Sequence, residues 1–182
     1  MNWFSQLLEQ LFAFITGGQA APAAVPGQNL QAGQVVDAFS QAFEQYLGWT
    51  PAQALRAAAI ATAQSSVETA RWTSNVFAVT KSLMNRHRGN GRVGVPNSDG
   101  SWTGKVYYAT SADPDLRVYS SIQQSAQDFC QWLGEFPAVR AAYASGDAGA
   151  VGAALDAMGY SATAGYGTHV ANTFYQEYAS YA

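Results

Sequence analysis

The sequence predicts a mainly α-helical domain that carries a small β-hairpin lobe. Apolar side chains recur at helical spacing along most of the chain. Between residues 90 and 119 this periodicity gives way to short Val- and Tyr-rich pieces that glycines interrupt. With 182 residues, of which 48% are hydrophobic, the chain can bury a substantial core, and one domain is expected.

The first fifteen residues are predicted to form an amphipathic helix. Its apolar side chains share one face: Trp3, Phe4, Leu7, Leu8, Leu11, Phe12 and Ile15. We assign residues 1–16 to this helix, and residues 17–33, rich in Ala, Pro, Gly and Gln, to a linker. The helix either packs on its own domain or docks to a protein or a membrane surface. Because Glu9 interrupts it and no Lys or Arg precedes it, neither a standard cleavable signal peptide nor a membrane-spanning helix is expected.

The domain itself is placed at residues 34–182 and begins with two helices. The first is predicted from Val35 to Leu47, with Gly48 as its C-terminal stop. Thr50 and Pro51 are typical of a helix start, so a second, Ala-rich helix is expected from there to about residue 70.

A β-hairpin and three more helices are predicted in the rest of the domain. The hairpin pairs residues 92–95 with residues 105–109 across a turn at residues 97–100. The helix signals are a capping box at Ser121 and Gln124 with a stop at Gly134, an N-cap at Asp147 with a stop at Gly159, and a final apolar stripe at Val170, Phe174 and Tyr178. Cys130 falls on a buried stripe and is interpreted as a core residue rather than a reactive thiol.

Composition disfavours several functional classes. The net charge is -3 and charged residues make up 12% of the chain, so no broad basic field is available for nucleic acid, and a neutral or carbohydrate partner fits better. One cysteine and two distant histidines provide no metal-ligand spacing, and no cofactor is expected. The basic residues that cluster are Lys81, Arg86, His87, Arg88 and Arg92; they belong to a solvated loop, or they meet carboxylates of peptide stems.

Glu68 is the first candidate for chemistry. It shares a helix face with Gln64, in a stretch otherwise made of small and apolar residues. Burial and the negative end of the helix dipole would both raise the pKa of its carboxyl toward that of a general acid. The alternative is an exposed Glu68 that pairs with Arg71.

Four segments carry a resemblance to a known family. They are Gln64–Glu68 with Trp72, Asn75–Val79, Leu116–Ser121, and Leu155–Tyr160 with Tyr166 beyond. In this order they resemble the glucosaminidase domain of flagellar-rod hydrolases and cell-wall autolysins, glycoside hydrolase family 73. The resemblance covers about residues 51–178.

The resemblance implies a lysozyme-like fold with a substrate groove between a helical body and a β-lobe. It implies hydrolysis of the β-1,4 bond after N-acetylglucosamine in peptidoglycan, in the cell envelope (periplasm or cell wall) or a phage virion. Glu68 then corresponds to the general acid, and Tyr160 to a tyrosine near the cleaved sugar. A muramidase or lytic transglycosylase on the same fold is one alternative. The other is a structural or glycan-binding module, of a phage particle or an envelope apparatus, that has lost turnover.

Further site residues are assigned with their alternatives. Six residues are predicted to bind sugar, five through aromatic rings and one through an amide: Trp72, Asn75, Phe77, Trp102, Tyr108 and Tyr166. Aromatic residues at such positions are equally often part of the hydrophobic core. The second glutamate that many family members carry on the hairpin is missing. Asp99 and Asp113 are the possible second acids, and both sit in expected turns. The family's acid after Gly-Tyr is also replaced, near Ala162–Ala164.

Overall fold

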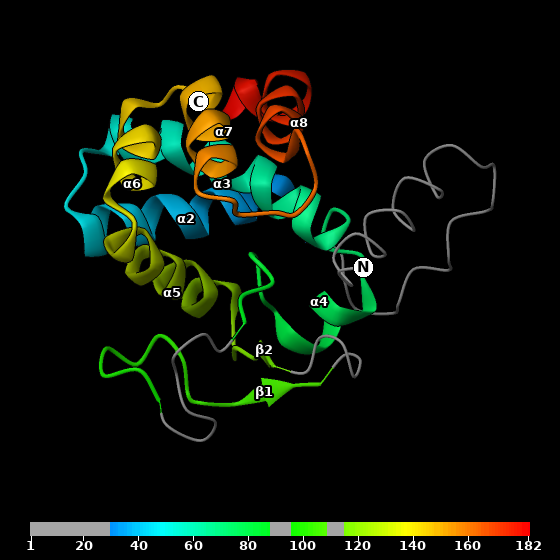
Figure 1. Cartoon of the computed structure of the whole chain (residues 1–182). Helices are drawn as coiled ribbons and strands as arrows, with labels where there is room; N and C mark the ends of the chain where they lie inside the picture. The colour runs from blue at the N-terminus through cyan, green and yellow to red at the C-terminus, as the bar shows by residue number, and fades with distance from the viewer. Residues whose placement is uncertain (1–29, 88–95, 109–114) are drawn as a thin grey trace.

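A computed structural model of the protein describes residues 30–87, 96–108 and 115–182. Within these ranges the fold is mainly helical, as the sequence predicted, with one two-stranded antiparallel sheet. Figure 1 shows the helices packed into a body with helix α3 running through it, and the two strands in a separate lobe on one side. The expected helix at residues 1–16 and the linker up to residue 29 lie outside the described residues.

Helix α2 spans Ala32–Leu47 and confirms the first predicted helix of the domain. It starts three residues earlier than expected, where Gln31 and Gln34 close its first turn. The Gln34 backbone N–H donates to the Gln31 carbonyl at 3.0 Å, and the Gln31 backbone N–H donates to Gln34 Oε1 at 2.9 Å. Helix α2 thus includes residues 32 and 33, the last two that the sequence assigned to the linker. The helix ends at Gly48, whose φ of 68° is left-handed as a glycine stop requires.

Helix α3 spans Pro51–Thr69 and lies at the centre of the body. Thr50 caps it as predicted, accepting a hydrogen bond from the Gln53 backbone. The residues of its last three turns are all buried, from Ala57 to Thr69. Their small side chains let neighbouring helices approach closely, so α3 is covered on all sides at the end that carries Glu68.

The lobe begins with an unpredicted helix and contains a strand pair with an unexpected partner. Helix α4 spans Asn75–Thr80, too short to show a helical period. Strand β1 (Val106–Tyr107) pairs with strand β2 (Leu116–Arg117). Strand β2 was not predicted as a partner of β1, and the expected partner at residues 92–95 lies outside the described residues. The turn at Asn97–Gly100 is confirmed by a backbone hydrogen bond of 3.0 Å between its ends.

Asp128 ties this lobe to the helical body. Its buried carboxylate accepts hydrogen bonds from Arg117 Nη1 at 2.5 Å and from the Tyr119 hydroxyl at 2.6 Å. Asn97 Nδ2 donates to it at 2.8 Å, and Arg86 Nη1 lies 3.2 Å away. Two guanidinium groups and two neutral donors compensate for the desolvation of the carboxylate, so the lobe is held by a fully partnered charge.

The remaining helices close the body. They are α5 (Ile122–Glu135), α6 (Pro137–Ser145), α7 (Ala148–Ala157) and α8 (Tyr166–Thr173), followed by a π-helical turn at Phe174–Tyr178 and a 3₁₀ turn at Ala179–Tyr181. Ser121 and Asp147 cap α5 and α7 as predicted. Helix α5 runs past the expected stop at Gly134 by one residue, and α6 was not predicted. Cys130 is buried in the core, which raises the pKa of its thiol to about 12.

Two glycines allow α7 and α8 to cross in backbone contact. A Cβ added to Gly152 would lie 2.4 Å from the carbonyl oxygen of Gly167, and a Cβ on Gly167 would lie 1.9 Å from that of Gly152. No larger residue fits without moving a helix. This crossing fixes the start of α8, and with it the side chain of Tyr166.

Candidate functional site

Glu68 occupies the last turn of α3, where the sequence placed it, and only 7% of its surface is exposed. Burial raises the pKa of its carboxyl from 4.5 to about 7, and a hydrogen bond from Tyr166 partly opposes this rise. The desolvation of a carboxylate outweighs one hydrogen bond because the charged form loses most of its hydration. At neutral pH this side chain is therefore present both as acid and as carboxylate.

Tyr166 holds the carboxyl in place. Its hydroxyl donates a hydrogen bond to Glu68 Oε1. The tyrosine begins α8 and is itself buried, so this contact joins two helices that lie far apart in the sequence. Because Oε1 accepts this bond, Oε2 is the oxygen left to carry the acidic proton.

Arg71 does not take the role that the alternative interpretation gave it. Its guanidinium pairs with Glu177, with Nε 3.1 Å from Oε2, in a contact on the surface of the body. Glu68 is buried and bonded to Tyr166 instead. The prediction of an exposed Glu68–Arg71 pair was therefore wrong, because the end of α3 is covered by α8.

Tyr160 lies beside this pair. Its ring stacks on that of Tyr166 with centroids 5.3 Å apart and an angle of 25°. The ring is partly exposed, while burial of the hydroxyl and the nearby Glu68 raise the pKa of the phenol well above its usual value. The hydroxyl of Tyr160 therefore stays protonated and can act as a hydrogen-bond donor near the carboxyl.

Gln64, one turn before Glu68, completes the polar interior of the site. It is fully buried, and its Oε1 accepts a hydrogen bond from the Tyr143 hydroxyl. Its Nε2 lies near enough to the Tyr160 hydroxyl to lower the pKa of that phenol, yet it has no hydrogen-bond partner among the described residues. The amide is thus oriented by Tyr143 with its donor side toward Tyr160.

Four of the aromatic residues assigned to sugar binding lie in the interior instead, and one of them is Tyr166, which is 3% exposed and bonded to Glu68. Trp72 is 5% exposed, and its indole nitrogen donates to Ser65 Oγ at 2.9 Å. Phe77 is 3% exposed, and Trp102 is fully buried beneath the guanidinium of Arg117, 4.3 Å from the ring centroid. Their burial leaves no ring face open to a sugar and favours the core interpretation.

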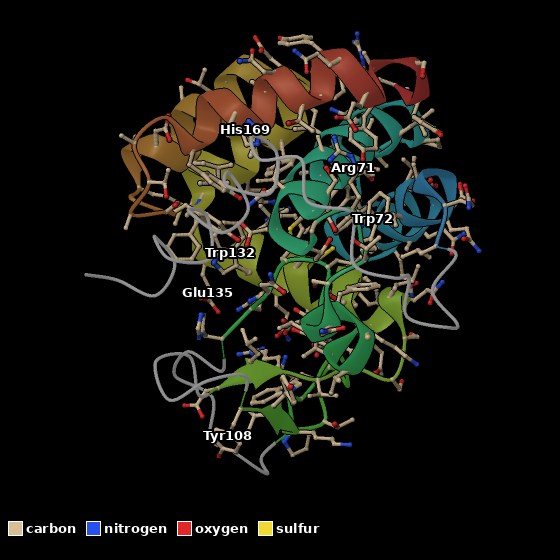
Figure 2. The ribbon with its side chains drawn as sticks, turned by 90° about the vertical axis from the view of Figure 1, so that its right-hand side faces the viewer. Arg71, Trp72, Tyr108, Trp132, Glu135 and His169 are labelled. Atoms are coloured by element: carbon tan, nitrogen blue, oxygen red, sulfur yellow. The ribbon has the colours of Figure 1, made fainter. Side chains whose placement is uncertain are left out.

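The remaining two residues assigned to sugar binding lie on the surface. Tyr108 is 61% exposed at the end of β1, and Asn75 is exposed at the start of α4. Figure 2 shows Tyr108 on the lobe, well below the helical body. Contact of these two side chains with a glycan remains a prediction.

The carboxylates near the lobe hold structural positions. Asp99 Oδ1 accepts hydrogen bonds from the Ser101 backbone at 3.0 Å and from its hydroxyl at 2.6 Å, the turn role that the sequence suggested. Asp128 forms ion pairs with Arg86 and Arg117. Asp113, the other possible second acid, lies outside the described residues.

Members of the basic cluster take separate roles. Arg86 reaches the buried Asp128, and Lys81 Nζ donates to the Ser120 carbonyl at 2.8 Å. His87 forms an isolated bridge with Leu116. Arg88 and Arg92 lie outside the described residues. Arg86 is therefore part of the core of the lobe rather than of a solvated loop.

Sequence reasoning missed two residues next to the site. Tyr143 lies on the unpredicted helix α6, and Trp132 lies on α5 beside the apolar stripe that was recognised there. Trp132 meets Tyr160 edge to face, with centroids 5.5 Å apart. The spacing of Trp132 from Phe129, one helical turn, was the available signal.

The described part of the chain shows neither a metal-binding cluster nor a membrane-spanning helix. No group of three or more His, Cys, Asp or Glu side chains there is arranged to hold a metal ion. None of the helices in those ranges is long and apolar enough to span a membrane. In comparisons with known proteins, no family model, no curated protein and no solved structure matches the chain.

Proposed function

We propose that the protein is a glycoside hydrolase that cleaves the β-1,4 bond after N-acetylglucosamine in peptidoglycan, with Glu68 as general acid. The observation that carries this proposal is the buried Glu68 carboxyl, whose pKa is raised to about 7. An acid that gives a proton to a leaving sugar oxygen must be protonated near neutral pH, and with a pKa of about 7 a large part of this side chain is. The resemblance of the segments around Glu68 and Tyr160 to family 73 supports the same chemistry.

The bond-breaking step follows from the geometry around Glu68. Tyr166 occupies Oε1, so the proton on Oε2 passes to the glycosidic oxygen as the bond from that oxygen to the sugar C1 breaks. The Tyr160 hydroxyl, a donor beside the carboxyl, orients the N-acetyl group of the substrate or the water that attacks C1. The water that bonds to C1 releases one proton to solvent, and the carboxylate left on Glu68 regains a proton from solvent.

A lytic transglycosylase on the same fold is the second candidate, and one observation favours it. Asp99 is bonded within its own turn and Asp128 is neutralised by two arginines, so neither is free to act as a second carboxylate. A reaction in which a group of the sugar itself attacks C1 needs one protein acid. We infer from either reaction that peptidoglycan strands of the cell envelope are the partner and that the site works there or in a phage particle.

Digestion of purified peptidoglycan, followed by mass analysis of the new chain ends, tests these proposals. The hydrolase should release N-acetylglucosamine reducing ends. Muramic reducing ends would identify a muramidase, and anhydromuramic ends a lytic transglycosylase. If wild type and the Glu68→Gln variant release equally few ends, the enzyme proposal fails and a structural or glycan-binding module remains.

A further inference from the structure

A partly exposed tryptophan packs against Tyr160, the tyrosine next to the buried acid. Trp132 lies on α5 and keeps part of its surface open, unlike Trp72 and Trp102, which are buried. Figure 2 shows Trp132 and Glu135 on the side of the helical body that faces the lobe. An aromatic ring left open at such a place offers a flat apolar surface without the flexibility of an aliphatic side chain.

The indole is fixed by other aromatic rings. Phe129 stacks beneath it, with centroids 5.3 Å apart and an angle of 16°, and Phe136 packs at 5.0 Å. Tyr160 meets it edge to face at 5.5 Å. Three contacts hold one orientation of the ring before any ligand arrives, which lowers the entropy lost on binding.

This arrangement leads from the surface to the acid. Trp132 touches Tyr160, Tyr160 stacks on Tyr166, and Tyr166 is bonded to Glu68. The contacts from Trp132 to the carboxyl therefore pass through two aromatic side chains, Tyr160 and Tyr166. Glu135, exposed one turn beyond Trp132 on the same helix, offers oxygens that accept hydrogen bonds from hydroxyl groups.

From this geometry we infer a sugar-binding subsite in which the apolar face of an N-acetylhexosamine ring stacks on Trp132, with Glu135 accepting hydrogen bonds from its hydroxyls. The inference rests on the proposed function, because it places the ring in the strand that Glu68 cleaves. A pyranose ring has an apolar C–H face and a rim of hydroxyls, which matches a flat aromatic surface bordered by a carboxylate.

Trp49 provides a matched control. It is also partly buried and packs on an aromatic ring, Phe43, at 5.0 Å. It precedes α3, whereas Glu68 ends that helix, so the two are separated by about 25 Å at 1.5 Å per residue. Loss of Trp49 removes an indole from the aromatic packing of the body, far from the acid.

Binding of tetra-N-acetylchitotetraose to the full chain, measured by calorimetry in the Glu68→Gln background, tests the subsite without turnover. Trp132→Ala should weaken binding about tenfold, and Trp132→Phe, which keeps the packing on Phe129, about threefold. Trp49→Ala should leave the affinity unchanged. Glu135→Gln should weaken binding less than Trp132→Ala does.

Equal affinity in the Trp132 variants and the parent would overturn the subsite, and so would failure of the parent to bind. If Trp132→Ala does not fold, Trp132→Phe decides in the same way. The two proposals can fail separately. If the Glu68→Gln parent binds the oligosaccharide and the Trp132 variants bind it more weakly, while wild type releases no chain ends from peptidoglycan, the subsite is supported and the hydrolase is refuted. If wild type releases chain ends but substitution of Trp132 does not change binding, the hydrolase is supported and the subsite is refuted.

Discussion

Replacing Glu68 by Gln should remove a pH-dependent part of the stability together with nearly all hydrolysis. The pKa of this carboxyl is about 7 in the folded protein and 4.5 as a model group. At 1.36 kcal/mol per pKa unit, ionising it in the folded protein costs about 3 kcal/mol more than in the unfolded chain. Because the folded-state pKa is raised, this stability is fully present below a pH of about 4.5 and is lost as the pH rises through about 7.

Urea unfolding of wild type and Glu68→Gln across this pH range measures the effect. From acid to alkaline pH the variant should gain about 3 kcal/mol relative to wild type, because the amide never ionises. Gln keeps an oxygen that can accept the Tyr166 hydrogen bond, so the fold should persist. Hydrolysis of peptidoglycan should fall by about 10²- to 10⁴-fold, since an amide cannot serve as the acid.

The exposed glutamate of α2 supplies the control for loss of a carboxylate: Glu44→Gln should leave turnover unchanged. Parallel stability curves for wild type and Glu68→Gln would show that the carboxyl is solvated, and the reasoning from burial would fail. Turnover like that of wild type with an unchanged melting curve would show that Glu68 is not the acid.

Three further outcomes are expected. Tyr166→Phe removes the hydrogen bond that lowers the pKa of Glu68, so the alkaline limb of the pH-rate profile should move to higher pH; a shift to lower pH would contradict this. Tyr160→Phe removes a hydroxyl beside the acid and should reduce kcat more than Asp99→Asn does, since Asn keeps the oxygen that accepts the Ser101 hydrogen bond. Steady-state rates in the opposite order would assign the chemistry to the lobe. The third variant lacks residues 1–29; the deletion stops there because α2 begins at residue 32. Folding and activity on soluble glycan fragments should stay near normal, while retention in the particle or membrane fraction should fall. An unfolded product by circular dichroism would place the leading segment in the core.

The helices that the sequence predicted well are those with local start and stop signals. The Thr50–Pro51 start, the Gly48 stop and the Asp147 cap each depend on hydrogen bonds or backbone angles within a few residues. Glu68 could likewise be placed on the last turn of its helix. These features require no knowledge of distant residues.

Short elements and strand partners were not determined in this way. Helix α4 has six residues, too few for a period, and α6 has only two buried side chains. Strand β2, which pairs with β1, was not predicted from the sequence. Arg117 of β2 reaches the buried Asp128 on α5, and such an ion pair between separate segments leaves no local pattern.

The position of Glu68 was thus determined by the sequence, and its chemistry by the tertiary structure. Tyr166, which bonds to it, lies 98 residues further along the chain. That contact requires α8 to cross α7 at the Gly152–Gly167 backbone contact. The pKa of a carboxyl depends on the water that its neighbours exclude and on the donors they supply, and both come from packing between distant helices.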